Sequence, residues 1–186
     1  MFQRVGGLYI IRLRSPRPAQ QAIAPGLVAL TEAETKCDCA VEKPFGQMTP
    51  QVLDRIKYLV KHYPWRKECD RKAIVGEGPR LSDSVRHGEL LEVARAATGF
   101  AEADMLTIGH NTKFKAHTDG NRTAQAVLIL GNVTGGGLYE CQGCAGANKH
   151  ENKKCGGKPC LHGDKDIWHR VPANAVHYSE DWVLKK

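Results

Sequence analysis

The strongest constraint on the fold is a change of pattern near Asp104. Before it, apolar residues recur at helical spacing, and after it short apolar segments alternate with turn residues. The expected strands cover residues 105–108, 124–130, 137–140, 167–171 and 176–183, and another leads into His117. This order predicts an α+β fold, a double-stranded β-helix (jelly roll, cupin-like) with N-terminal helices packed on it.

Two amphipathic segments predict the helices. Thr49-Pro50 is a typical helix start, and apolar residues then recur at spacings of three and four as far as Tyr63. A second helix is expected from about Ser84 to Thr98, with Gly99 as its C-terminal stop. The charged stretch Arg66 to Lys72 between them is expected to be a solvated loop.

Residues 1–47 are rich in proline and show no sustained periodicity, so we expect an irregular leader. Arg4, Arg12, Arg14 and Arg17 occur before the first acidic residue, which is typical of a mitochondrial or plastid transit segment and equally of a poorly structured N-terminus. Residues 48–186 are then expected to form one domain. The chain has no run of eighteen apolar residues, so we expect neither a transmembrane helix nor a membrane partner.

The charge and cysteine content bear on partners and location. A net charge of +7 suggests an acidic partner such as nucleic acid, although a generally basic surface explains it equally well. The N-terminus lacks the continuous apolar core of a secretory signal. We therefore interpret the seven cysteines as thiols or metal ligands of an intracellular protein, cytoplasmic or nuclear, or organellar if the leader is a transit segment.

His117 and Asp119 are the strongest candidates for chemistry. Side chains two residues apart on a strand point to the same side, so this pair can hold one metal ion. A second imidazole from a distant strand would complete a facial triad of two His and one carboxylate on iron, which leaves positions open for substrate and oxygen. A second His-x-Asp pair, His162 and Asp164, is weaker because Asp164 lies only thirteen positions before His177, which leaves little room for intervening strands.

The order of these motifs resembles that of the 2-oxoglutarate/Fe(II)-dependent oxygenase superfamily. The resemblance covers about Met105 to Lys186 and rests on His117-Thr-Asp119, the segment Gly135-Gly-Gly-Leu138 and Asn174-Ala-Val-His177. It implies His117, Asp119 and His177 as the iron ligands and catalytic centre, with His169 as a rival third ligand. It also implies that 2-oxoglutarate and O2 are consumed, giving succinate and CO2, while a substrate C–H bond is hydroxylated.

The anchor for the co-substrate departs from the family pattern. Family members place an Arg on the strand after the distal His, where this chain has Lys185 and Lys186. A Lys lacks the bidentate fork of Arg, so we expect one of three cases: the chain is truncated, the terminal lysines, Asn121 and Arg170 bind the co-substrate, or activity is lost. Lys113 and Lys115 are further candidates for this anchor.

The substrate stays open at this level. The motifs are most similar to the branch with nucleic-acid base oxygenases of the TET/JBP type, which implies oxidation of a methylated pyrimidine. Hydroxylation of a protein side chain is the alternative within the same chemistry. A different class is a catalytically inactive jelly-roll module that binds nucleic acid or protein.

A cysteine-rich insert at residues 141–165 interrupts the strands. Cys141, Cys144, Cys155 and Cys160 have spacings that fit a tetrahedral structural zinc site in a Gly- and Lys-rich loop. Free thiols, or two disulfides in an oxidising compartment, are the alternatives. The oligomeric state has no signal in the sequence.

Overall fold

The computed structural model describes residues 7–16, 46, 48–65, 70–74, 78–114, 116–119, 125–141, 160–172 and 175–185. In these residues the protein is mostly antiparallel β-sheet with two helices, an arrangement compatible with a β-sandwich. The elements are β1 (Tyr9–Arg14), α1 (Pro50–Lys61), β2 (Asp70–Ile74), β3 (Gly78–Val85), α2 (Glu89–Thr98), β4 (Met105–His110), β5 (Gln125–Leu130), β6 (Val133–Gly135), β7 (Leu138–Cys141), β8 (Cys160–His162), β9 (Trp168–Val171), β10 (Val176–Ser179) and β11 (Trp182–Leu184).

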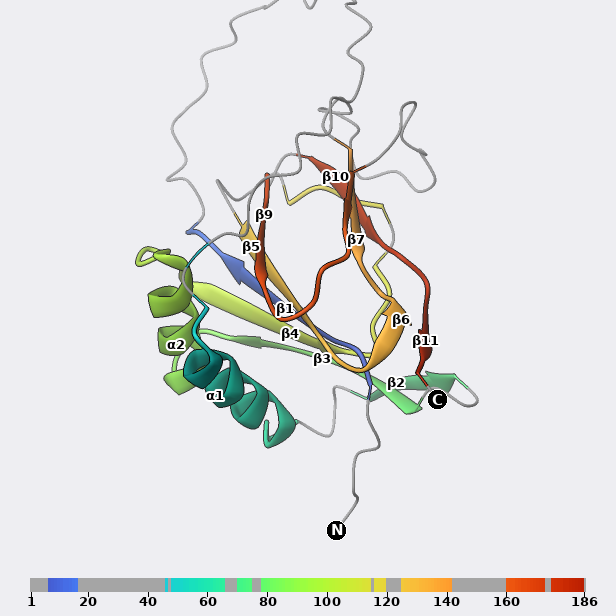
Figure 1. Ribbon diagram of the computed structural model, residues 1–186, viewed down its shortest axis with the longest axis horizontal. Helices are drawn as coiled ribbons and strands as arrows, with labels where there is room; N and C mark the ends of the chain where they lie inside the picture. The colour runs from blue at the N-terminus through green and yellow to red at the C-terminus, as the bar shows by residue number, and fades with distance from the viewer. Residues whose placement is uncertain are drawn as a thin grey trace, which may run out of the picture.

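The largest sheet has six strands in the order β2-β3-β4-β1-β5-β9. Strand β1 lies between β4 and β5 and is antiparallel to both, so the N-terminal strand is central to this sheet (Figure 1). A three-stranded sheet, β10-β7-β8, and a two-stranded sheet, β11-β6, complete the β-structure of the described residues.

An apolar layer, which we call the inter-sheet core, joins the large sheet to the two smaller ones. Because side chains alternate along a strand, even-numbered residues of β1 face this layer. Its members are Leu8, Ile10, Val127, Ile129, Val133, Leu138, Val171 and Trp182, all of which are buried. The metal-ligand candidates lie at one end of this layer.

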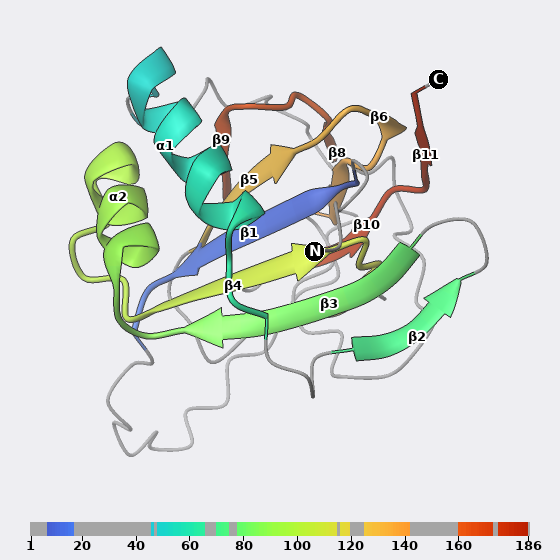
Figure 2. The same ribbon diagram turned by 90° about the horizontal axis from the view of Figure 1, so that it is seen from below.

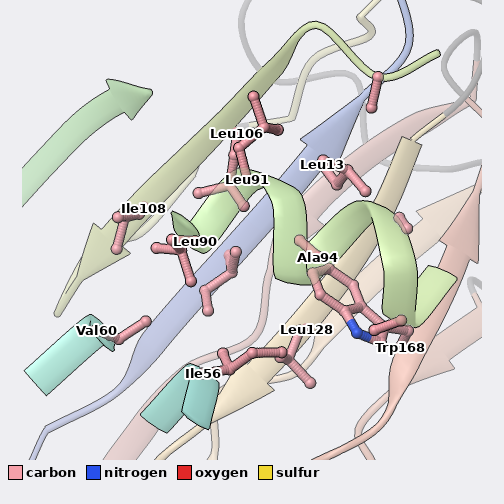
Figure 3. Close-up of a cluster of buried hydrophobic side chains, with 14 of the residues drawn as sticks. Leu13, Ile56, Val60, Leu90, Leu91, Ala94, Leu106, Ile108, Leu128 and Trp168 are labelled. Carbon is pink, nitrogen blue, oxygen red and sulfur yellow. The ribbon is translucent and has the colours of Figure 1, made fainter. Parts of the chain in front are cut away.

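Both helices cover the opposite face of the large sheet (Figure 2). Ile56 and Val60 of α1 and Leu91 and Ala94 of α2 pack there against β1, β4, β5 and Trp168 of β9 (Figure 3). Thr49 caps α1 by accepting a hydrogen bond from the Val52 amide at 3.3 Å, as the Thr-Pro signal predicts. Within the described residues, neither helix is long and apolar enough to cross a membrane.

The glycines at the end of β6 and directly after it permit a close approach of two segments of the chain. Gly135 and Gly136 have φ values of 73° and 81°, in the left-handed region that favours glycine. A Cβ at position 135 would collide with the Asp181 carbonyl, so only glycine lets the chain before β11 pass here. The segment over 176–183, which the sequence predicts to be one strand, forms two strands, β10 and β11, in different sheets.

Three expectations need correction. The irregular leader over 1–47 contains the central strand β1, whose Ile11 and Leu13 are fully buried. The second helix begins at Glu89 and not at Ser84, because residues 78–85 form β3 and pair with β4. The segment expected as a charged loop includes β2, which pairs with β3.

Candidate metal centre

The side chains of His117, Asp119 and His177 come together at one end of the inter-sheet core. One ligand atom from each lies within 4.8 Å of the other two. His177 Nε2 is 3.6 Å from Asp119 Oδ2, and His117 Nε2 is 4.0 Å from Asp119 Oδ1. Neighbouring ligands at about 2.1 Å from one metal are roughly 3 Å apart, so a bound metal would draw these atoms closer together. The structure thus brings together the three residues that the sequence predicts.

Backbone pairing holds the two histidines in register. His117 and His177 form an antiparallel bridge, with reciprocal amide-to-carbonyl hydrogen bonds of 3.1 and 2.9 Å. Their ring centroids are consequently 4.3 Å apart, although 60 residues separate them in the chain. His117 lies in this isolated bridge and not in a regular strand, so a long-range contact and not the local strand pattern orients it.

The ring of His177 is prepared to bind a metal. It is fully buried, and its Nδ1 lies 3.0 Å from the Ala175 carbonyl oxygen, which assigns the ring proton to Nδ1. Nε2 then presents a lone pair and has no hydrogen-bond partner in the described part of the chain. Burial, with the nearby His117 second, lowers the pKa of His177 to about 4, so the ring is neutral at physiological pH. A neutral imidazole with an orphaned buried nitrogen fits a metal ligand.

Two arginines of β1 face the same centre. Arg14 Nη2 lies 3.4 Å from Asp119 Oδ1, and Arg12 Nη1 lies 3.7 Å from Asp119 Oδ2. Arg12 Nη1 is also 3.2 Å from His117 Nε2, the atom that would bind a metal. The Asp119 side chain is only 10% exposed. One buried carboxylate therefore faces two guanidinium groups.

The positions of both arginines follow from strand alternation. Ile11 and Leu13 pack under the helices, so Arg12 and Arg14 face the inter-sheet core with Leu8 and Ile10. The Arg12 guanidinium lies 4.1 Å from the Phe114 ring centroid. Burial, and secondly the charge of Arg14, lowers the pKa of Arg12 to about 10, so it keeps its charge at neutral pH.

The residues that the sequence suggested as co-substrate anchors lie elsewhere or outside the described residues. Arg170 is exposed, on the face of β9 opposite to His169 and Val171. Lys185 follows β11 and is exposed, and Lys113 forms an ion pair of 3.0 Å with Asp181. Asn121, Lys115 and Lys186 lie outside the described residues. Arg170 therefore lies on the face of its strand away from the inter-sheet core, and Lys113 is paired with an exposed carboxylate.

A second polar pair lies beside the centre. Glu140 pairs across the strands with His177, so both side chains are on one face. Its Oε2 lies 2.7 Å from His162 Nε2, and its Oε1 is buried without a partner. The rival ligand His169 donates from Nε2 to the Asp164 carbonyl at 2.7 Å and stacks edge-on with His162. Neither histidine belongs to the metal-ligand group.

Two of the four predicted zinc ligands, Cys141 and Cys160, lie among the described residues. Cys160 is disulfide-bonded, so its sulfur is not available as a zinc thiolate in this structure. Cys141 is buried at the end of β7. Cys144 and Cys155 lie outside the described residues.

Sequence reasoning missed Arg12 and Arg14 because they were assigned to a basic leader. The segment Leu8-Tyr-Ile-Ile-Arg-Leu-Arg14 is rich in β-branched and aromatic residues, which is a strand signal. Charged residues at alternate positions of an apolar strand would have indicated a functional face. Gln125 and Glu140 carried no local signal, since only the register of their strands places them inside.

Comparison with known proteins adds no relatives. No protein-family model, no curated protein and no solved structure matches this chain.

Proposed function

We propose that this protein is an Fe(II)- and 2-oxoglutarate-dependent dioxygenase that hydroxylates a C–H bond of a macromolecular substrate, on a double-stranded β-helix scaffold. The observation that carries the proposal is the convergence of His117, Asp119 and His177 at the end of the inter-sheet core. Two imidazoles and one carboxylate on one side of a cation are the ligand set of non-haem Fe(II) oxygenases.

The donor set fits a divalent ion. Asp119 Oδ2 and His177 Nε2 are buried atoms without hydrogen-bond partners among the residues that the structure describes, and a metal would satisfy both. Zinc also binds His and carboxylate ligands, so the residues alone do not select iron. The resemblance to the oxygenase superfamily favours iron over zinc.

The charge balance supports a dianionic co-substrate. With a divalent ion bound, the Asp119 carboxylate would face the metal charge together with Arg12 and Arg14. Buried like charges are costly without counter-ions, so the site favours a ligand with two negative charges. 2-Oxoglutarate is such a dianion, and a guanidinium can hold a carboxylate through two parallel hydrogen bonds. We assign the role of co-substrate anchor to these two arginines. They replace Lys185 and Lys186, which the sequence suggested for this role.

The residues of the chain then have distinct tasks. His117, Asp119 and His177 would hold Fe(II), whose chemistry with 2-oxoglutarate and O2 oxidises a substrate C–H bond and yields succinate and CO2. Arg12 and Arg14 would neutralise and orient the dicarboxylate. The Nδ1 hydrogen bond of His177 to Ala175 would keep the metal-binding nitrogen deprotonated. The buried apolar residues of the inter-sheet core would limit the access of water to the site.

Succinate production tests the proposal. The purified protein is incubated with 2-oxoglutarate, O2 and Fe(II), and succinate is measured with and without a chelator. We expect slow Fe(II)-dependent turnover even without the prime substrate, and loss of turnover in His177→Ala. His87→Ala, at an exposed histidine between β3 and α2, is the matched control and is expected to keep wild-type turnover.

A protein that binds neither Fe(II) nor 2-oxoglutarate would contradict the proposal and favour an inactive binding module. The substrate is tested separately. Binding to nucleic acid that weakens steeply with salt would favour a nucleic-acid base over a protein side chain, in line with the net charge of +7.

A further inference from the structure

Gln125 is a fully buried amide without hydrogen-bond partners among the described residues. It opens β5, its side chain is 0% exposed, and within the described part of the chain neither Oε1 nor Nε2 has a partner. A buried amide without partners destabilises the fold relative to a satisfied one. Buried polar groups are nearly always paired in native proteins, so we expect a bound ligand to supply a hydrogen-bond partner for this side chain.

The register of the large sheet places Gln125 next to the arginines. Gln125 is the direct cross-strand partner of Arg14, so the two side chains are on the same face with Cβ atoms about 5 Å apart. Val127 and Ile129, on the same face of β5, belong to the inter-sheet core. On the other side, Gln125 pairs with Val171, a fully buried apolar residue. The polar neighbour along these strands is thus Arg14, whose guanidinium reaches Asp119.

We infer that Gln125 is a binding residue for the dicarboxylate co-substrate, and that its amide Nε2 donates a hydrogen bond to a carboxylate held by Arg14. This inference rests on the proposed function. A neutral donor suits this place because a third cation beside Arg12 and Arg14 would add repulsion in a buried site. The fold tolerates the unpaired amide because the ligand satisfies it.

The test is Gln125→Leu, which keeps the approximate shape and removes the polar atoms. Two effects of opposite sign are expected. The melting temperature of the ligand-free protein rises by about 2–8 °C, because an unsatisfied buried amide is removed. The Kd for 2-oxoglutarate, measured by calorimetry with Mn2+ in place of iron, increases about 10- to 100-fold, because a hydrogen bond to a charged group is lost.

Gln125→Glu is the second variant and tests the sign of the ligand charge. A carboxylate at position 125 can pair with Arg14, so we expect the fold to be retained. The same carboxylate would repel a bound anion. We expect weaker binding of 2-oxoglutarate than in Gln125→Leu. The matched control is Gln51→Leu at an exposed position of α1, which is expected to change neither quantity.

The outcomes separate the two proposals. If the wild-type protein binds 2-oxoglutarate and both Gln125 variants bind it with the same Kd, the role of Gln125 is overturned. The oxygenase proposal then stays intact. Absence of metal-dependent 2-oxoglutarate binding in the wild-type protein overturns both. A lower melting temperature together with an unchanged Kd in Gln125→Leu assigns Gln125 to packing alone, which also overturns the inference.

Discussion

Replacing Asp119 by Asn tests the buried charge cluster directly. The change keeps the shape of the side chain and removes its negative charge. Arg12 and Arg14 then face each other with the counter-charge of Asp119 removed, and both side chains are largely buried, at 7% and 15% exposure. We expect a large loss of stability in addition to loss of metal binding.

The magnitude follows from the distances. Ion pairs at 3.7 and 3.4 Å are each worth about 4–5 kcal/mol at an effective dielectric constant of roughly 20. Desolvation of the charges offsets part of this energy. Removal of one member of a buried pair typically costs about 3–5 kcal/mol, and we expect a loss within that range. This is a large share of the roughly 5–15 kcal/mol that stabilises a domain.

Urea denaturation at neutral pH is the appropriate assay. A chelator is present throughout, so that metal binding does not contribute to the difference. The free energy of unfolding is compared between the wild-type protein and Asp119→Asn, with circular dichroism as the signal.

The control is Asp181→Asn, which removes an ion pair with Lys113. The side chain of Asp181 is 91% exposed. Exposed pairs contribute little, so this variant should unfold like the wild type. A free energy of unfolding for Asp119→Asn within about 0.5 kcal/mol of the wild type would refute the reasoning, because the two arginines would then not depend on this carboxylate.

Three further predictions concern the same centre and its strand. Arg12→Gln should bind Mn2+ more tightly in a chelator competition, because Arg12 lies 3.2 Å from the His117 nitrogen. The same variant should bind 2-oxoglutarate more weakly in calorimetry. If both affinities rise or both fall, this prediction is contradicted. His177 has a pKa of about 4 in the folded protein, below the ordinary 6.5, so the unfolded chain binds more protons between these values. Metal-free stability should thus fall by on the order of 3 kcal/mol as pH drops from 6.5 to 4, and a flat urea-denaturation profile would argue against it. Deletion of residues 1–16 should abolish cooperative thermal unfolding by removing β1, and a retained sharp transition would show that β1 is dispensable.

Local patterns were sufficient for several parts of the molecule. Thr49-Pro50 places the start of α1, and the apolar run before Leu130 places β5. The spacing of His117 and Asp119 predicts two metal ligands from one short segment, and both belong to the group that comes together in space. These features are short-range, because caps, alternation and turn residues act over a few positions.

Tertiary structure decided what completes the site. Pairing of β1 with β4 and β5 joins residues about a hundred positions apart, and no local periodicity encodes that choice. The same pairing turns two arginines from a supposed leader into the neighbours of Asp119, and it aligns Gln125 with Arg14. The sequence alone determined the identity of the metal-ligand candidates. The register of distant strands determined the charges around them, since a strand shows which face is buried only when its partners are known.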